Sequence, residues 1–360
     1  MKHPLSLATL VFLVASWLPA DEVLQAVALV KAGNGQGSGF VVREGDDYFL
    51  YTNTHVLEGG TPLSASTMAG NALTLGALEL ADKRDLARLS LPAYAGAALE
   101  LVSGIPALDD PIQVIGNSDG AGVATKLEGK VLGVGPDLIE IDAKFVQGNS
   151  GSPILNEAGE VLGLATFAVK HAEPENWLKE DSRFKEIRRY GVRIEGTTWV
   201  EMDMEGFQKR AALLADLNEM FTHIYHMKFT EVYDNAARTE VVYNASIEAG
   251  KFREYRWFAR DLGTYAVQLN GAWEWVQSFR RGVNEHNRTR SQSQRRDAVR
   301  DIKMSQLMYQ QRIVGFRRES DRLRAKVRRL LAHDHWGTDY FLEKAKVQYK
   351  MLNHILEVPE

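Results

Sequence analysis

The spacing of apolar residues changes once along this chain of 360 residues, near residue 205. Before that point, short aliphatic and β-branched runs alternate with Gly, Asn and Asp clusters, a pattern typical of short β-strands. After it, apolar residues recur at three- and four-residue steps, as at Phe207, Ala211 and Leu214, which indicates amphipathic helices. The chain is therefore expected to fold as a β domain followed by an all-helical one.

The first half predicts many strands at short spacing, with no long helical pattern between them. Such a series favours an antiparallel barrel or sandwich. The predicted strands are Ala26–Lys31, Ser38–Arg43, Tyr48–Thr52, Leu86–Leu91, Ile112–Ile115, Thr125–Val134, Leu138–Ile141, Ile154–Leu155, Val161–Phe167 and Tyr190–Glu195.

Charge divides the chain at the same place. Residues 1–205 carry 16 basic against 28 acidic residues, a net charge of −12, and the remainder carries 27 against 19, or +8. The most basic stretch, Arg280–Arg329, holds 16 Lys and Arg against 5 Asp and Glu. It predicts either the solvated side of a helix, whose other side would hold Val299, Leu307 and Val314, or a surface for an anionic protein or envelope partner. Nucleic acid is disfavoured because the chain is expected to be exported.

Export is indicated by the first 20 residues. A basic start is followed by an apolar run from Leu5 to Leu18 and then by Pro19-Ala20, the pattern of a secretory signal cleaved after Ala20. An uncleaved anchor is the alternative, because Leu18 is a less favoured residue three before the cut. No later apolar stretch is long enough to span a membrane, so the mature chain is expected to be periplasmic or secreted.

The chain contains no cysteine. This excludes disulfides, thiolate metal sites and a cysteine nucleophile. In a secreted chain, it favours a bacterial envelope over an animal secretory pathway.

Three segments carry residues that could act together in catalysis. They are Thr52-Asn53-Thr54-His55-Val56, Arg84-Asp85-Leu86-Ala87-Arg88 and Gln147-Gly148-Asn149-Ser150-Gly151. A serine hydroxyl is a poor nucleophile unless an imidazole takes its proton, and that imidazole needs a carboxylate to fix its tautomer. Each residue also has a plain alternative, namely a loop histidine, a solvated acid at a strand end and a glycine turn.

Read together, residues 26–200 resemble a trypsin-fold (chymotrypsin-like) serine protease, and most closely the cysteine-free bacterial Deg/HtrA-type branch. The resemblance implies a double antiparallel β-barrel over residues 21–204. The helical, basic residues 205–360 do not resemble the PDZ domains that usually follow, and a bundle or coiled coil is expected there. The motifs that carry the resemblance are Gly37-Ser38-Gly39-Phe40-Val41-Val42, Thr52-Asn53-Thr54-His55-Val56, Asp85-Leu86-Ala87-Arg88-Leu89, Ile115-Gly116-Asn117-Ser118-Asp119-Gly120, Gly148-Asn149-Ser150-Gly151-Ser152-Pro153 and Gly159-Glu160-Val161-Leu162-Gly163-Leu164.

The resemblance implies a role for each catalytic residue. His55 would be the general base, Asp85 its orienting acid and Ser150 the nucleophile. The backbone N–H groups of Gly148 and Ser150 would form the oxyanion hole. Asp82 is the rival to Asp85, but only Asp85 begins the Asp-Leu-Ala pattern of the family.

The resemblance also implies a specificity pocket, near Phe145, Thr166, Ala168 and Gly191. The Thr166 hydroxyl resembles one that often bonds the triad aspartate. Because no acidic residue stands at these positions, the pocket cannot offset the desolvation of a Lys or Arg side chain. Cleavage is therefore expected after small or medium apolar residues.

Two departures from the family pattern bear on activation. Asn149 stands where trypsins have an aspartate that captures a new N-terminus, so activation by that ion pair is not expected. Ser152 replaces the usual second glycine of the nucleophile loop and could perturb it. A charged insertion at residues 171–189 could gate the cleft or could be a solvated loop.

The sequence thus predicts a serine endopeptidase that hydrolyses polypeptides through an acyl-enzyme, without metal or cofactor. The alternative is a catalytically inactive trypsin-fold scaffold whose helical domain binds a partner.

Overall fold

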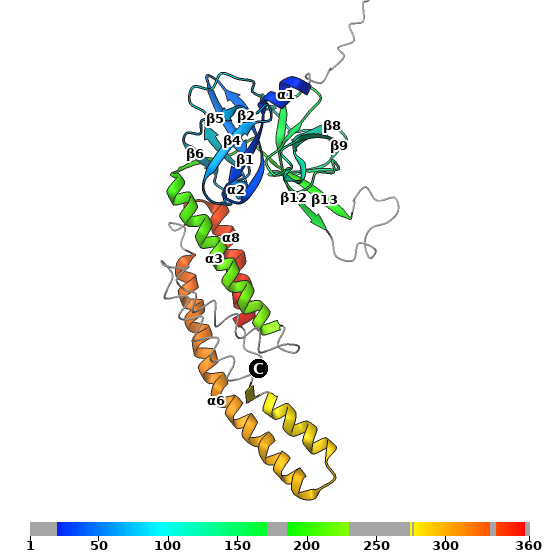
Figure 1. The fold of residues 1–360 in the computed structure, drawn as a ribbon, viewed down its shortest axis with the longest axis vertical. Helices are drawn as coiled ribbons and strands as arrows, with labels where there is room; N and C mark the ends of the chain where they lie inside the picture. The colour runs from blue at the N-terminus through cyan, green and yellow to red at the C-terminus, as the bar shows by residue number, and fades with distance from the viewer. Residues whose placement is uncertain (1–19, 171–185, 230–273, 276, 332–335, 357–360) are drawn as a thin grey trace, which may run out of the picture. The chain divides into compact units, whose positions relative to one another are not determined.

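The computed structural model describes residues 20–170, 186–229, 274–275, 277–331 and 336–356 (Figure 1). The expected signal peptide up to residue 19 and residues 171–185 of the charged insertion lie outside these ranges. The chain divides into two compact units, Met1–Lys209 and Arg210–Glu360.

The first unit begins with an eight-stranded antiparallel sheet. Its strand order is β14-β6-β7-β3-β2-β1-β4-β5, so the last strand in sequence lies at one edge. The strands are β1 (Val27–Ala32), β2 (Gly35–Glu44), β3 (Asp47–Thr52), β4 (Leu63–Thr67), β5 (Ala72–Leu73), β6 (Leu78–Ala81), β7 (Ala87–Ser90) and β14 (Trp199–Met202), and two short helices accompany them, α1 (Ala20–Ala26) and α2 (Thr54–Leu57).

The other six strands of this unit form a closed antiparallel barrel in the order β10-β13-β12-β11-β8-β9. Its interior is filled by aliphatic side chains such as Val114, Ile139 and Ile154, none of which is exposed by more than 1%. The strands are β8 (Pro111–Asn117), β9 (Ala124–Val134), β10 (Leu138–Ile141), β11 (Pro153–Leu155), β12 (Val161–Lys170) and β13 (Ile187–Arg193), with a single 3₁₀ turn, η1 (Ser118–Gly120), after β8.

A single apolar cluster joins the sheet to the barrel. Phe40 and Tyr51 of the first sheet pack in it with Ile115, Leu164 and Val192 of the barrel, and all five are at most 4% exposed. Burial of this much apolar surface stabilises one relative placement of the two layers. The ends of strands that carry the predicted site residues meet at this junction.

The structure differs from the predicted double barrel in its first half. Hydrogen bonding closes the second barrel, whereas the first sheet stays open between its edge strands β5 and β14. Four of its strands, β4, β5, β6 and β14, were not predicted. They are two to five residues long, and β4 is mostly small and polar, so none shows a clear alternating apolar pattern.

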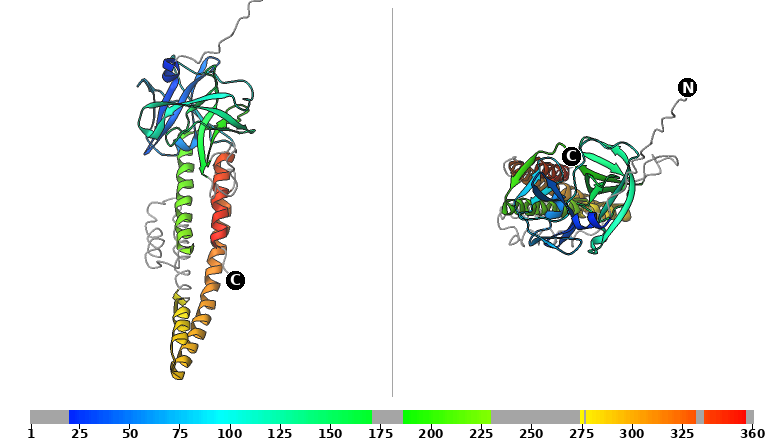
Figure 2. Two further views of the ribbon diagram at one scale, coloured as in Figure 1. Left: turned by 90° about the vertical axis from the view of Figure 1, so that its right-hand side faces the viewer. Right: turned by 90° about the horizontal axis from the view of Figure 1, so that it is seen from above.

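The described part of the second unit is helical. It contains α6 (Gln292–Leu330), α8 (Asp339–Leu356), most of α3 (Met204–Phe229) and a helix at 277–288. The 277–288 helix lies along α6 (Figure 2), where a Cβ added at Gly282 would stand 2.9 Å from Ile302 Cγ1. Arg328 of α6 donates to the Tyr349 hydroxyl of α8 at 2.5 Å.

The apolar side expected for α6 is only partly buried. Val299, Leu307 and Val314 are 37%, 50% and 67% exposed, so this part of the predicted packing face is wrong. Across the described residues, no helix has both the length and the apolar character to span a membrane.

Candidate active site

The histidine lies where the first sheet turns from β3 into the short helix α2. His55 is one residue beyond the first helical position, and its imidazole is about one-third exposed. Its Nδ1 lies 2.6 Å from Asp85 Oδ2, and its backbone N–H donates to Asp85 Oδ1 at 3.0 Å. Both oxygens of the carboxylate thus contact one residue, which fixes the ring orientation and leaves Nε2 facing away from the acid.

The acid comes from the tight connection between β6 and β7. Asn53 Nδ2 donates a hydrogen bond to the backbone carbonyl of Asp85 at 2.6 Å. Asp82, the rival in the sequence, instead donates its backbone N–H to the Thr198 carbonyl at 2.9 Å. The structure therefore brings Asp85 to His55.

The serine arrives from the other layer, on the loop before β11. The Ser150 carbonyl accepts a hydrogen bond from the Ser38 N–H at 2.8 Å, which docks the loop on β2. The Ser150 hydroxyl donates to the Thr166 carbonyl at 3.4 Å. Asn53 Nδ2 also donates to Thr166 Oγ1, at 3.1 Å. Thr166 therefore connects the serine to the histidine–aspartate pair, and its hydroxyl reaches the acid through Asn53.

Asn53 is not among the site residues predicted from the sequence. It occupies the N-cap position of α2, but its side chain makes no capping hydrogen bond and serves Asp85 and Thr166 instead. An Asn before a helix is ordinarily assigned to capping. The partners of this side chain lie 32 and 113 residues away, so local pattern could not reveal them.

The nucleophile loop depends on two glycines in the left-handed region. Gly148 has φ +91° and Gly151 has φ +85°. A Cβ at Gly148 would stand 2.2 Å from the Asn117 carbonyl oxygen, and one at Gly151 would stand 2.1 Å from that of Ser38. Backbone and space thus both require glycine at these positions.

This loop leaves two backbone donors unused. Within the described parts of the chain, neither the Gly148 N–H nor the Ser150 N–H donates a hydrogen bond. The Ser38 hydroxyl donates a hydrogen bond to the Gly148 carbonyl at 2.9 Å, which holds this carbonyl in place. The N–H group of Gly148 and that of Ser150 itself can therefore stabilise an oxyanion.

A buried amide supports the loop from beneath. Asn149 Oδ1 accepts from the Val146 N–H at 3.0 Å and from the Ser118 hydroxyl at 3.1 Å. Asn149 is fully buried, and its Nδ2 meets no hydrogen-bond partner among the described residues. An amide here holds the turn without any charged partner, unlike the aspartate of trypsins.

The backbone of Ser152 is hydrogen-bonded on both sides, while its buried hydroxyl has no hydrogen-bond partner among the described residues. Its N–H donates to the Asn149 carbonyl at 2.8 Å, and its carbonyl accepts from the Ala165 N–H at 2.9 Å. Its hydroxyl lies over Gly116, where a Cβ would stand 1.8 Å from Ser152 Oγ. Gly116 on β8 therefore leaves room for the side chain of Ser152, which stands where the family has its second glycine.

The four predicted pocket residues have different environments. Phe145 is 4% exposed and packs in the barrel core. Gly191 faces the barrel interior as well, since a Cβ there would stand 2.2 Å from Ile154 Cδ1. Thr166 is buried and Ala168 is exposed. No acidic side chain stands at these four positions.

A basic residue, Arg189, lies against this group and was not predicted. It pairs with Ala168 across β12 and β13, and its Nε donates to the Phe145 carbonyl at 2.8 Å. Burial lowers the pKa of Arg189 below its usual range. Among the described residues no ion pair of Arg189 is found.

Part of this chain is similar in sequence to known proteins. A family model described as "Trypsin-like peptidase domain" matches residues 37–164. The probable periplasmic serine endoprotease DegP-like of Brucella suis biovar 1 is 32% identical over 141 residues, 36% of this chain and 27% of that protein. The serine endoprotease DegS of Haemophilus influenzae is 23% identical over 207 residues, 51% of this chain and 59% of that protein.

One solved structure is similar to about half of this chain. The serine endoprotease from Yersinia pestis is 22% identical, covers 48% of this chain and 60% of its own, and superposes with a TM-score of 0.39. The chain spans between about a quarter and three-fifths of the length of the curated relatives named above.

Proposed function

We propose that this chain, whose trypsin-like peptidase domain is of the Deg/HtrA type, is a serine endopeptidase that hydrolyses polypeptides. The observation that carries the proposal is the His55–Asp85 pair, with 2.6 Å between Nδ1 and Oδ2, linked to Ser150 through Asn53 and Thr166. Two unused N–H groups beside Ser150 add the means to stabilise a negative oxygen.

In the proposed mechanism, rotation about the Ser150 Cα–Cβ bond turns its hydroxyl from the Thr166 carbonyl to His55 Nε2. As the hydroxyl oxygen attacks the substrate carbonyl carbon, His55 takes its proton, and Asp85 stabilises the resulting imidazolium. The N–H groups of Gly148 and Ser150 bind the developing oxyanion.

Collapse of that intermediate breaks the peptide C–N bond. His55 returns the proton to the leaving amine, and the acyl group stays on Ser150. A water molecule then attacks the ester as His55 takes its proton, and the acid product leaves with the Ser150 hydroxyl restored. These steps require no metal or cofactor.

We further propose that the chain is exported and acts in the periplasm or outside the cell, after cleavage near Ala20. The signal-like first 20 residues and the periplasmic naming of the Brucella suis relative support this location. The helical residues 205–360 would serve regulation or bind an anionic protein or envelope partner.

The test of the proposed function is labelling of the mature chain by a fluorophosphonate probe, together with cleavage of a denatured protein. We expect a single labelled residue, Ser150, and loss of both signals in Ser150→Ala. Ser103→Ala, which changes an exposed loop serine, is the matched control and should keep both. If the folded wild-type chain is neither labelled nor active, the inactive-scaffold alternative replaces this proposal.

Specificity gives a second prediction. Peptides with Val or Ala before the scissile bond are expected to be cleaved at least about tenfold faster, by kcat/KM, than the same peptides with Lys or Arg there. No carboxylate stands at the four predicted pocket positions, and the positive charge of Arg189, which lies beside Phe145 and Ala168, repels a cation. A peptide library read by mass spectrometry checks this, and a preference for basic residues would contradict it.

A further inference from the structure

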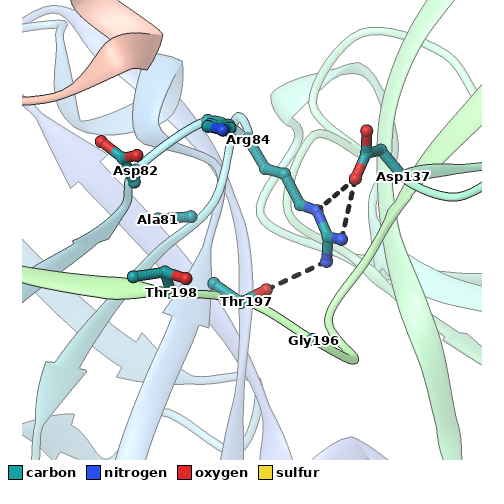
Figure 3. A pocket seen from close by; sticks show the side chains of 8 residues that line it. Ala81, Asp82, Arg84, Asp137, Gly196, Thr197 and Thr198 are labelled. Carbon is teal, nitrogen blue, oxygen red and sulfur yellow. Dashed lines mark hydrogen bonds and ion pairs between the residues drawn. The ribbon is translucent and has the colours of Figure 1, made fainter.

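Arg84, the residue before Asp85, reaches from the first sheet to the barrel. Its backbone belongs to the short connection between β6 and β7, and its side chain extends toward Asp137 in the turn between β9 and β10 (Figure 3). It passes the segment that returns from β13 to β14. Arg84 thus joins the first sheet, through its backbone, to the barrel, through its side chain, directly beside the triad acid.

The guanidinium makes contacts through three nitrogens. Nε and NH2 lie 2.9 and 2.8 Å from Asp137 Oδ1. NH1 donates to the carbonyls of Arg193 at 3.0 Å and Glu195 at 2.6 Å, and to Thr197 Oγ1 at 3.2 Å. The Arg84 side chain is only 13% exposed. A planar, multidentate donor of this kind fixes the direction as well as the distance of its partners.

The segments that it joins are themselves tied together. The Arg193 N–H donates to the Asp137 carbonyl at 2.9 Å, so both barrel partners belong to one unit of structure. In the 82–86 connection, Ala81 donates to the Leu86 carbonyl and Leu86 donates to the Arg84 carbonyl, each at 2.8 Å. Leu86 is fully buried. Because this connection is short and tightly bonded, displacement of Arg84 is transmitted to Asp85.

We infer that Arg84 is a positioning residue for the triad: its contacts with Asp137 and the β13–β14 segment hold the Asp85 carboxylate in line with His55 Nδ1. The inference rests on the proposed function. Asn53 holds the Asp85 carbonyl from the side of β3, and Arg84 holds the preceding residue from the side of the barrel. The His55–Asp85 pair, which lies wholly on the first sheet, thereby acquires a fixed relation to the barrel that carries Ser150.

The simpler alternative is that Arg84 contributes only to stability. Arg88 allows the two roles to be separated, because its side chain is equally buried, at 12% exposed, and bonds Glu44 and Glu79 at 2.9 and 2.8 Å. All three of these residues lie on or beside strands of the first sheet, so Arg88 does not bridge to the barrel. Loss of either arginine should reduce stability, and only loss of Arg84 should alter the triad.

The experiment compares Arg84→Met and Arg88→Met in the full mature chain, at a temperature where circular dichroism shows each to be folded. For Arg84→Met we expect fluorophosphonate acylation of Ser150 about 10- to 100-fold slower, with KM for a peptide changed less than about threefold. The midpoint of its pH–rate profile should move to lower pH, because a displaced Asp85 stabilises the protonated imidazole less. Arg88→Met should keep the wild-type rate and midpoint.

A second readout does not depend on activity. The proton between His55 Nδ1 and Asp85 should give a far-downfield ¹H NMR signal in the wild type and in Arg88→Met, and a broadened or missing one in Arg84→Met. Loss of this signal in Ser150→Ala,Arg84→Met, but not in Ser150→Ala, would support the inference even if the wild type proves inactive.

Chemical rescue adds a third arm. The cavity beside Arg84, about 250 Å³ and lined by Asp137 and Thr197 among others, offers room for a small cation (Figure 3). Millimolar ethylguanidinium is expected to restore part of the acylation rate of Arg84→Ala and to leave the rate of Arg88→Ala unchanged. If Arg84→Met is folded and matches Arg88→Met in rate, pH midpoint and NMR signal, Arg84 has only a structural role and the inference is wrong.

Discussion

Replacement of Asp85 by asparagine is expected to lower kcat by about 10⁴-fold, with KM and stability changed little. The amide can still accept the His55 backbone N–H that now bonds Oδ1 at 3.0 Å, so the local fold should survive. At the other position an amide N–H₂ cannot accept from Nδ1. The imidazole would then adopt the wrong tautomer and lose its electrostatic support as it becomes charged. Steady-state cleavage of a peptide substrate measures the effect.

The matched control is Asp82→Asn, three residues earlier in the same connection. Asp82 donates its backbone N–H to the Thr198 carbonyl, and the substitution leaves this hydrogen bond in place. We expect kcat within about threefold of the wild type. A large loss in Asp82→Asn with a small one in Asp85→Asn would reverse the assignment of the triad acid.

The three catalytic residues could be predicted from the sequence because each of them lies next to the end of a strand. A strand fixes where its last side chain stands, and the family motif around His55, Asp85 and Ser150 supplied the roles. The structure brings His55 and Asp85 within hydrogen-bond distance, and it links Ser150 to them through Thr166. Local sequence was sufficient here because each motif is itself local.

The groups that hold these residues in place could not be predicted in the same way. Asn53 and Ser38 bind partners between 32 and 113 residues away, and two of these partners, Thr166 and Gly148, lie across the junction of sheet and barrel. Arg84 resembles any other charged loop residue in the sequence. Its role depends on Asp137 and on the return from β13 to β14, and β14 itself was not predicted.

The pocket illustrates a different limit. The family resemblance predicts that Phe145 and Gly191 lie at the substrate pocket. In the structure, the Phe145 side chain and the Cα of Gly191 face the packed interior of the barrel. On a strand, neighbouring side chains point to opposite faces, so an uncertainty of one residue exchanges core for surface. The register shift between Ala165 and Phe167 in β12 adds to this uncertainty.

The buried amide beneath the nucleophile loop leads to the second large prediction. In Asn149→Asp, one carboxylate oxygen can accept from Val146 and Ser118 as Oδ1 does now. The other would occupy the site of Nδ2, which is buried and has no partner among the described residues. At neutral pH this places a negative charge in a buried site to which the described residues supply no hydrogen-bond donor, which should lower the free energy of unfolding by about 3 kcal/mol.

The pH dependence of this loss identifies its cause. Burial should raise the pKa of the introduced carboxyl in the folded state above its unfolded value of about 3.9. Below the unfolded pKa the carboxyl is protonated in both states, so the penalty should largely vanish. As the pH rises, the unfolded state ionises first, and the loss should grow until the pH passes the folded pKa. Urea unfolding of Asn149→Asp and wild type at several pH values between about 3 and 7 measures the difference.

The control is Asn71→Asp, which introduces the same charge at an exposed residue. It should change stability by less than about 0.5 kcal/mol over the same pH range. A stable Asn149→Asp at pH 7 would mean that a cation reaches this site, as the new N-terminus does in trypsins. A loss that does not depend on pH would instead place the cost in packing of the loop. The predicted result is that the nucleophile loop is held by a neutral amide and requires no N-terminal clip to form.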